Sequence, residues 1–553
     1  MMAARRDSQK EPWGSKAVWA GLFALVAVVH LYFVPYFPAL NNPNENARVY
    51  QVRAFVELRK FSVDEQIARY GMVNDLAEKE GKLYSGKAPG TTFLGVPVYA
   101  ALRAGLRALH RPEATPFQLL LVLRLTTSLL PTLAFMLIFR AFIRRKIGDA
   151  RVSNALTIVL ALGTMMLPYA LLYVNHSLSA ASAFGAVIAA DTALERRHAA
   201  RASALSMAWL AVAGFLAAFA AALDYALAPV ALMILLVVLW WVKPRWAEFV
   251  TLNLGALVPS VMTGLYHQVC WGGPFRVSVS FLANPEFASN AAQGVFGIIG
   301  PTRESVWGVM LSPGKGLLFF SPVIAVGLVA VVAAALVSRH AKLATLDLAV
   351  VTWLLLYGVS LINWDAGWTV GPRYVTAAMP FTLFSIGLWW LELGPRGRAV
   401  LLVALAGLGA SSILVMVGAG VMFPHLQPGF VNPLLDSIWP LWRDAITPHS
   451  VGRWLFGWHG RMDQLPVVSA VAVLIAYLLL VAGRACRLGR RPFAGAAAGV
   501  LAAVAIASGS IGVMTIPRTR DPRVLAEGTR FLRTFVWEPK LDAPPAHPYV
   551  PRR

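Results

Sequence analysis

Residues 117–146 read FQLLLVLRLTTSLLPTLAFMLIFRAFIRRK. The first 23 of these residues contain a single charged side chain, Arg124, whereas the last seven, 140–146, contain four basic ones. A helix needs about 20 apolar residues to cross the hydrocarbon core of a bilayer. Basic residues gather at the cytoplasmic ends of such helices. The stretch therefore predicts a membrane-spanning helix whose C-terminal end faces the cytoplasm.

The composition extends this interpretation to the whole chain. Of its 553 residues, 58% are hydrophobic and only 14% are charged, whereas soluble domains carry about 25% charged residues. The net charge of +22 raises the question of nucleic acid, but most basic clusters fall between apolar runs, which is the pattern of membrane topology. The two cysteines, Cys270 and Cys486, offer no disulfide framework. We expect a multi-pass membrane protein that does not bind nucleic acid.

Hydropathy predicts an all-α bundle of about 13 transmembrane helices. They are expected near 17–37, 117–139, 153–173, 177–194, 203–223, 226–242, 247–270, 317–337, 346–362, 375–391, 399–422, 466–483 and 493–516. The first run lacks a small-residue cleavage site, so we read it as an uncleaved span. With the N-terminus in the cytoplasm, alternation of the spans places the basic clusters inside. Counting 91–109 as a span would move the later clusters outside, so that run is predicted to be a surface-lying or partly inserted helix on the outer face.

This topology divides the chain into five parts. They are a cytoplasmic N-terminus (1–16), a first transmembrane helix (17–37), a long extracytoplasmic loop with surface helices (38–116), a bundle (117–516) with outer loops at 271–316, 363–374 and 423–465, and a Pro-rich extracytoplasmic tail (517–553). Any chemistry is therefore expected at the extracytoplasmic surface of the membrane.

The stretch Gly81–Thr91, GKLYSGKAPGT, resembles the start of a phosphate-binding loop. Ala88 stands where such a loop needs Ser or Thr, no buried strand is predicted before it, and Pro89 opposes an immediate helix. Lys87 is better interpreted as a cation at the membrane edge, either a snorkelling anchor or a point charge for a lipid phosphate. Asp75 lies 12 residues before it.

The segment 41–58, NNPNENARVYQVRAFVEL, predicts an amphipathic helix outside the first span. Asn42 would cap it and Pro43 would occupy its first position, with Glu45 completing a near capping box. Glu45 and Arg48 share one face. Glu45 is either a capping group or a carboxylate positioned to act as a base, and the two roles are compatible.

Further cations and aromatic residues are predicted on the same outer side. Arg124 lies near the outer end of its span, where it either snorkels or meets an anion, and His176 lies at an outer turn. The loop NWDAGWTVGPRY adds a cluster, and Lys315 lies in LSPGKGLLFFSP. Cations suit a phosphate, and aromatic faces suit a sugar or an apolar chain. The loop cluster consists of Trp364, Asp365, Trp368, Arg373 and Tyr374.

In this order and spacing, five segments resemble the GT-C superfamily of membrane glycosyltransferases, in the branch of protein mannosyltransferases and aminoarabinose-lipid A transferases. The resemblance covers most of the first 380 residues, and the remainder matches only as further spans. The segments are NENAR (44–48), YSGKAPGT (84–91), LRLTT (123–127), SPGKGLLFFSP (312–322) and WDAGWTVGPRY (364–374).

The resemblance implies a GT-C-like bundle and a hexosyl- or pentosyltransferase that uses a polyprenyl-phosphate sugar as donor. Glu45 corresponds to the family's base. Many members carry Asp where this chain has Glu45, so Asp75 is kept in reserve as the base. Lys87 and Arg124 correspond to the residues on the carrier phosphate, with Arg373 or His176 assisting. Arg48, Lys315 and the remaining residues of the loop cluster are then expected to contact substrate.

The implied reaction moves the sugar to a hydroxyl acceptor (a lipid, glycan or protein) with inversion, at the outer face of a bacterial inner membrane in the cell envelope. No metal site is expected from the residues, although the resemblance leaves a divalent cation open. A transporter or flippase of a lipid-linked sugar is the alternative. Transporters place charges near the bilayer midplane in paired halves, whereas the charges here gather on one face, which favours the enzyme.

Overall fold

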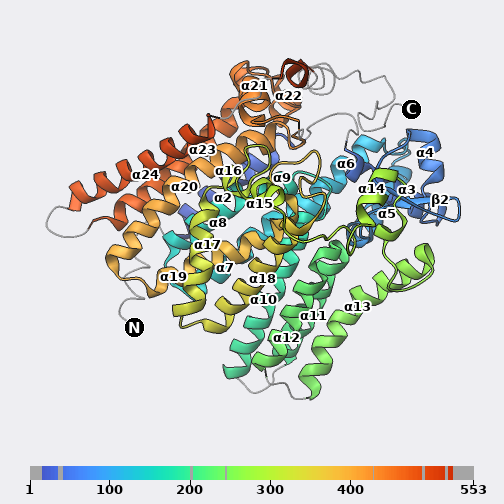
Figure 1. Cartoon of the computed structure of the whole chain (residues 1–553), viewed down its shortest axis with the longest axis horizontal. Helices are drawn as coiled ribbons and strands as arrows, with labels where there is room; N and C mark the ends of the chain where they lie inside the picture. Colours follow the sequence, from blue (N-terminus) through green and yellow to red (C-terminus); the bar gives the residue numbers. More distant parts are fainter. Residues whose placement is uncertain are drawn as a thin grey trace.

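The computed structural model describes residues 15–34, 42–199, 204–242, 246–426, 429–487, 492–516 and 521–526. The predicted cytoplasmic N-terminus before residue 15 and most of the predicted outer tail lie outside these residues. Within them the protein is a bundle of helices with one short β-hairpin (Figure 1).

The predicted spans all coincide with apolar helices. Among the described residues, nine helices are long and apolar enough to cross a membrane, and four more are apolar but shorter. Together they account for every predicted span. The long ones are Pro116–Ile147, His176–Arg197, Ala204–Leu223, Trp246–Trp271, Ala341–Ser360, Arg373–Glu392, Pro395–Met422, Arg461–Ala485 and Pro492–Met514, and the shorter ones are Lys16–Leu31, Ala150–Leu162, Tyr225–Trp241 and Val323–Val337.

Two of these spans are interrupted in ways that matter for the site. The first long one consists of α6 (Pro116–Leu123), the π-helix η2 (Arg124–Leu129) and α7 (Leu130–Ile147). The predicted span 153–173 ends early, because α8 (Ala150–Leu162) stops at Gly163 and is followed only by the short α9 (Met166–Ala170). Residues 171–175 then run in an irregular path into α10 (His176–Ala199).

The remaining spans follow in chain order and are joined by short elements. Their bounds are α2 (Lys16–Leu31), α11 (Ala204–Leu223), η3 (Tyr225–Leu227), α12 (Ala228–Val242), α13 (Trp246–Trp271), η4 (Ser278–Phe281), α14 (Pro285–Ala291), α15 (Arg303–Met310), α16 (Leu317–Phe320), α17 (Val323–Val337), α18 (Ala341–Ser360), η5 (Arg373–Ala378), α19 (Met379–Glu392), α20 (Pro395–Met422), η6 (Leu434–Ile438), α21 (Trp439–Arg443), α22 (Val451–Phe456), α23 (Arg461–Ala485) and α24 (Pro492–Met514).

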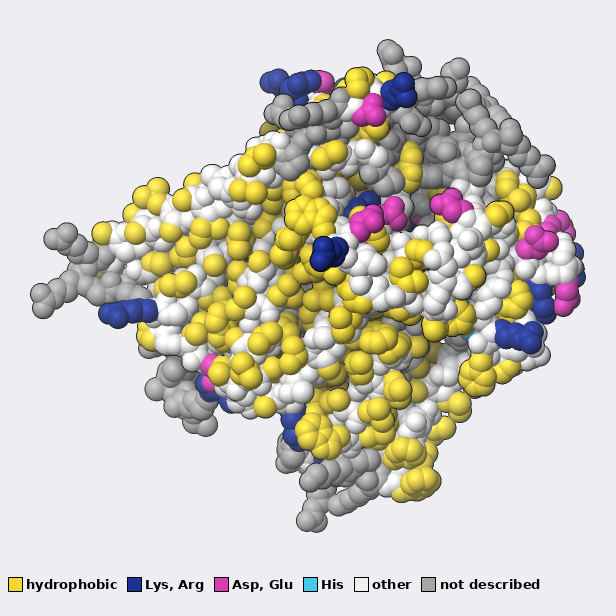
Figure 2. All heavy atoms as spheres, viewed as in Figure 1, with side chains coloured by type: hydrophobic (Ala, Val, Ile, Leu, Met, Phe, Trp, Pro, Cys, Tyr) yellow, Lys and Arg dark blue, Asp and Glu magenta, His cyan; other side chains and the backbone are white. Residues whose placement is uncertain are grey.

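Small residues let neighbouring spans approach closely, as is common in membrane bundles. A Cβ on Gly214 of α11 would collide with the backbone of Leu252 in α13, and one on Gly255 would collide with Ala211 in return. Similar contacts join α20 to α24 at Gly407 and α23 to α24 at Gly499. In Figure 2 hydrophobic side chains cover most of the left and lower surface, and most acidic side chains lie at the top and right. This surface matches a membrane-embedded body with a polar end.

The predicted outer loop folds into a compact unit at the right of Figure 1. Its helices confirm the prediction of a helical loop, but the hairpin was not predicted. The run 90–108 is a helix and is not among the apolar helices long enough to span, as expected. The elements of the unit are α3 (Pro43–Leu58), α4 (Asp64–Tyr70), β1 (Leu76–Lys79), β2 (Lys82–Ser85) and α5 (Gly90–Ala108).

Candidate functional site

The start of α3 is buried against the bundle. Asn42 caps the helix by accepting a hydrogen bond from the N–H of Asn44, and Pro43 occupies the first turn, as predicted. However, every residue from 44 to 54 is buried. The prediction of an amphipathic surface helix was therefore wrong, because α5 covers one side of α3 while the hairpin and the bundle cover the rest.

Glu45 does not turn back to complete a capping box. Its carboxylate accepts hydrogen bonds from Arg124 Nε at 2.7 Å and Arg124 Nη2 at 2.6 Å, and Oε1 also accepts one from the N–H of Tyr173 at 2.6 Å. The side chains of Glu45 and Arg124 are 0% and 1% exposed. The structure thus joins the predicted base to one of the predicted phosphate ligands, as a buried bidentate ion pair between α3 and η2.

One helical turn later, Arg48 belongs to a buried polar network. Its guanidinium donates to the hydroxyl of Thr91 and to Asn175 Oδ1, the latter at 2.8 Å. Asn175 in turn donates from Nδ2 to Asp224 Oδ2 at 2.7 Å. Asp224 stands at the turn after α11 and also caps η3 at Ala226. The network therefore links the outer loop to two breaks between spans.

His176 forms the end of this network. Its Nδ1 lies 3.4 Å from Asp224 Oδ2, and its ring meets the ring of Tyr169 edge-on. The Nε2 atom is buried and has no hydrogen-bond partner among the described residues. His176 is therefore held by one ring nitrogen while the other is available to a ligand.

Asp75 and Lys87 meet at the end of the hairpin. The register pairs Leu76 with Ser85, so the backbone oxygen of Asp75 accepts the N–H of Gly86 at 2.9 Å. Gly86 leaves no room for a side chain there, since a Cβ would lie 3.0 Å from that oxygen. The Lys87 ammonium lies 2.8 Å from Asp75 Oδ1, and both side chains are partly exposed, at 20% and 17%. The hairpin thus brings together two predicted site residues.

The hairpin also explains why Gly81–Thr91 is not a phosphate-binding loop. Residues 82–85, which would wrap a nucleotide phosphate, form the paired strand β2. One expectation for this stretch was wrong: α5 begins at Gly90, directly after Pro89. Pro89 occupies the cap position, where its missing N–H costs no helical hydrogen bond.

Arg373 completes the cluster from the other side of the site. It opens η5, its Nη2 lies 3.4 Å from the hydroxyl of Tyr374, and its guanidinium lies over that ring. Lys87, Arg48 and Asp75 are all within its electrostatic reach. Its buried Nε has no hydrogen-bond partner among the described residues.

The site is thus formed by three cations (Arg48, Lys87 and Arg373) and two carboxylates (Asp75 and Asp224) that interact with one another. Two buried nitrogens, on His176 and Arg373, remain available to a ligand. This excess of positive charge and donors suits an anion such as a phosphate.

Burial and the neighbouring charges shift several pKa values outside the spans. Burial lowers the pKa of Lys87, while Asp75 opposes that shift. Burial also lowers the pKa of Arg48. For Asp224, burial alone would raise the pKa, but the hydrogen bond with His176 and the nearby charges outweigh it, so the pKa lies below its ordinary value.

Lys315 has a different environment from the one predicted. Its ammonium donates to the carbonyl of Gly367, to the carbonyl of Thr369 at 2.9 Å and to the carbonyl of Leu426 at 3.4 Å. Burial lowers its pKa to about 7; Asp365 opposes the shift and Arg373 adds to it. Lys315 is thus occupied in tying the loop 363–374 to the segment that follows α20.

The predicted aromatic residues of loop 363–374 separate into two groups. Tyr374 lies beside Arg373, whereas the ring of Trp364 packs on Gly308 of α15 and Trp368 packs on the main hydrophobic core. Asp365 is within electrostatic reach of Lys315. The structure therefore brings only Arg373 and Tyr374 from this loop into the cation cluster.

The sequence interpretation missed two members of the network. Neither Asn175 nor Asp224 was among the site residues predicted from the sequence. Asn175 interrupts an apolar run at YVNHS, and Asp224 stands between two spans. Intramembrane polar residues are expensive and usually have a partner, so these two interruptions were the available signal.

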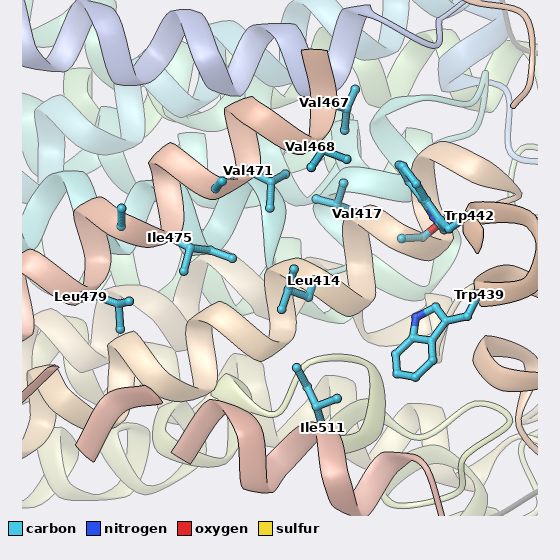
Figure 3. Close-up of a pocket in the computed structure, with 13 residues that line it drawn as sticks. Leu414, Val417, Trp439, Trp442, Val467, Val468, Val471, Ile475, Leu479 and Ile511 are labelled. Carbon is cyan, nitrogen blue, oxygen red and sulfur yellow. The ribbon is translucent and has the colours of Figure 1, made fainter. Parts of the chain in front are cut away.

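A cavity of about 640 Å³ lies away from this cluster, among α20, α21, α23 and α24 (Figure 3). Its walls are apolar, and the indole N–H of Trp442 already donates to the carbonyl of Gly418. It has no group for acid–base or phosphate chemistry, so we place the candidate site at the cation cluster. In the described ranges, no group of three or more His, Cys, Asp or Glu side chains is placed to hold a metal ion.

Neither a known protein-family profile nor the sequence of a curated protein matches the chain. Solved structures to which the chain is similar include ArnT from Cupriavidus metallidurans, in the apo state (18% identity, TM-score 0.44) and bound to undecaprenyl phosphate (16% identity, TM-score 0.45). Each alignment covers 93% of this chain and 78% of ArnT. The apo oligosaccharyltransferase of Archaeoglobus fulgidus is also similar, at 12% identity and a TM-score of 0.40, covering 88% of this chain and 60% of that one.

Proposed function

We propose that the protein is a membrane glycosyltransferase that moves a sugar, a hexose or a pentose, from a polyprenyl-phosphate donor to a hydroxyl acceptor. The observation that carries the proposal is the convergence of Lys87, Arg48 and Arg373 at one end of a bundle of apolar helices. A lipid-linked phosphate has its charge at that level and its chain in the bilayer, so it matches both features.

The proposed reaction is a single displacement. The acceptor oxygen attacks the anomeric carbon, the bond from that carbon to the phosphate oxygen breaks, and the electron pair leaves with polyprenyl phosphate. The configuration at the sugar therefore inverts. The three cations stabilise the charge that grows on the leaving phosphate.

The base remains to be assigned between Glu45 and Asp75. Both oxygens of Glu45 accept hydrogen bonds from Arg124, and one also accepts from Tyr173, so its lone pairs are largely committed. Asp75 is partly exposed and adjoins the phosphate-binding lysine. We therefore give Asp75 the role of base and Glu45 a positioning role, in which it fixes Arg124 and the start of α3.

The proposal places the cation cluster on the extracytoplasmic side, with the N-terminus in the cytoplasm of a bacterial cell. The basic clusters at the opposite ends of the spans support this orientation. The acceptor is a lipid, glycan or protein hydroxyl, and membrane lipid surrounds the bundle. No step of the proposed reaction passes through a metal ion.

The experiment is the release of polyprenyl phosphate from a panel of undecaprenyl-phosphate sugars by the purified protein in detergent, compared with its Asp75→Asn and Glu45→Gln variants. We expect release by the natural protein and at least a 100-fold loss in Asp75→Asn, the scale of general base catalysis. Release that survives in Asp75→Asn but is lost in a normally folded Glu45→Gln would return the base to Glu45. Tight donor binding without release from any donor would instead favour the transporter.

A further inference from the structure

The Lys87–Asp75 ion pair poses a problem for the proposed reaction. The cation that would bind the donor phosphate and the carboxylate that would take the acceptor's proton are bonded to each other at 2.8 Å. While the pair is closed, Asp75 Oδ1 faces the Lys87 ammonium and not an acceptor hydroxyl. Both groups can act only if the pair opens.

We propose that the donor phosphate displaces Asp75 from Lys87, so that the base becomes competent only after the donor has bound. This inference rests on the proposed function and adds to it a binding order. The donor enters first, and the acceptor hydroxyl is activated second.

The structure supports movement of the two side chains on a fixed backbone. The hairpin register and the hydrogen bond from Gly86 N–H hold the Asp75 and Gly86 backbones together, and the hydroxyl of Ser278 donates to the carbonyl of Gly86 at 2.9 Å. The side chains of Asp75 and Lys87, in contrast, are partly exposed. A lysine ammonium carries three donors on a flexible stem, so it can transfer to a phosphate without backbone change.

The charges of Arg373 and Arg48 favour the exchange of Asp75 for the phosphate. Both cations act on Lys87, and Asp75 lies within reach of Arg373 as well. When Asp75 leaves Lys87, it therefore still faces a cation. The incoming phosphate takes over the pairing of Lys87 in a cluster that has one more cation than carboxylates.

The charges balance through the reaction. The bound donor is a phosphodiester with one negative charge, and the released polyprenyl phosphate is a monoester that gains a second. The acceptor's proton moves to Asp75, which loses its own charge in the same step. Lys87 then faces a phosphate of higher charge while its former partner is neutral, so the Lys87–phosphate contact strengthens as the reaction proceeds.

The test is the binding of undecaprenyl phosphate to the purified full-length protein, measured by titration. Asp75→Asn removes the competitor for Lys87, so we expect it to bind about three- to tenfold more tightly, the scale of a partly exposed ion pair. Lys87→Met should bind more weakly, and the double variant should bind no better than Lys87→Met. With a sugar donor, Asp75→Asn should show a lower KM together with a much lower kcat.

Asp64→Asn is the matched control, because Asp64 also belongs to the outer loop but accepts its hydrogen bond from the backbone N–H of Leu83. It should leave undecaprenyl phosphate binding unchanged. Equal or weaker binding by Asp75→Asn, or a gain that persists without Lys87, would overturn the exchange and leave the proposed function standing. If the natural protein binds no undecaprenyl phosphate, both proposals fail.

Discussion

The carboxylate of Glu45 and the guanidinium of Arg124 lie 79 positions apart in the chain and meet through two hydrogen bonds of 2.7 and 2.6 Å. Neither side chain reaches solvent. The pair therefore fastens the outer loop to the first long span at the level of the candidate site. Because both charges are buried, removing either one takes away the opposite charge that the other is paired with.

We expect Glu45→Gln to lower the free energy of unfolding by about 3–5 kcal/mol, since Arg124 would stay buried and lose the carboxylate charge that it meets through two hydrogen bonds. Thermal unfolding of the purified protein in detergent measures this loss. Glu65→Gln is the control, because the Lys60–Glu65 pair is largely exposed and is expected to contribute no more than about 1 kcal/mol. A Glu45→Gln protein that unfolds at the normal temperature but transfers no sugar would identify Glu45 as the base instead.

The affinity for the donor phosphate should fall at alkaline pH. Burial holds the pKa of Lys87 below its ordinary value of 10.5, although Asp75 opposes the shift. Lys87 therefore begins to lose its charge below pH 10.5, and the donor phosphate then loses the positive charge that binds it. Titration of undecaprenyl phosphate between pH 8 and 10 follows this change, because the phosphate is already fully ionised there.

Lys87→Arg provides the matched comparison for this pH dependence. An arginine stays protonated throughout that range, so its affinity should be independent of pH even if it is lower overall. Parallel pH profiles for the two proteins would exclude Lys87 as the group responsible.

Lys315 should make stability depend on pH in a defined direction. Burial lowers its pKa from 10.5 to about 7, so between these values the unfolded chain holds a proton that the folded chain has released. Stability conferred by this group therefore rises as the pH rises from about 7 to 10.5. Lys315→Met removes the titration, and the difference in unfolding temperature between the two proteins should increase with pH. A constant difference would show that Lys315 keeps its proton in the folded state.

Asn175 should influence donor binding without touching the donor. It accepts from Arg48 and donates to Asp224, so Asn175→Leu removes one hydrogen-bond partner from the buried Arg48 guanidinium and one from the Asp224 carboxylate. We expect about a tenfold weaker affinity for undecaprenyl phosphate, which corresponds to about 1.4 kcal/mol, within the usual cost of an unsatisfied buried group. Asn290→Leu is the control, since Asn290 pairs with Asn363 in the outer loops. Equal effects of the two variants would contradict a specific role for Asn175.

The spans were predictable because their signal is local. About 20 consecutive apolar residues and the basic residues that follow them suffice to place a helix such as 117–139. Helix starts marked by capping residues, such as Asn42 followed by Pro43, could be predicted equally well. The hairpin around Gly81 was missed because its four-residue strands contain no clear alternation and sit in a charged loop.

Only part of the site could be predicted from the sequence, and the reason is different. Residue types and spacing pointed to Glu45, Lys87, Arg124 and Arg373, but pairing depends on burial and on contacts distant in sequence. Glu45 faces Arg124 because α3 is buried on all sides, which no helical periodicity in 43–58 indicates. Lys315 has a charge suited to substrate, yet carbonyls of loop 363–374 and of the segment after α20 take up its donors.

The π-helix that begins at Arg124 has a consequence for how such proteins vary between species. A π-turn contains one residue more than the corresponding α-helical turn. A π-turn absorbs its extra residue in one wider turn, so deleting one residue within 125–129 would restore a regular α-helix and leave Arg124 and α7 on nearly the same relative faces. Both the span and the contact with Glu45 would tolerate that change. In an alignment of homologues, we therefore expect one-residue differences in length at this turn to occur without loss of the acidic residue at position 45.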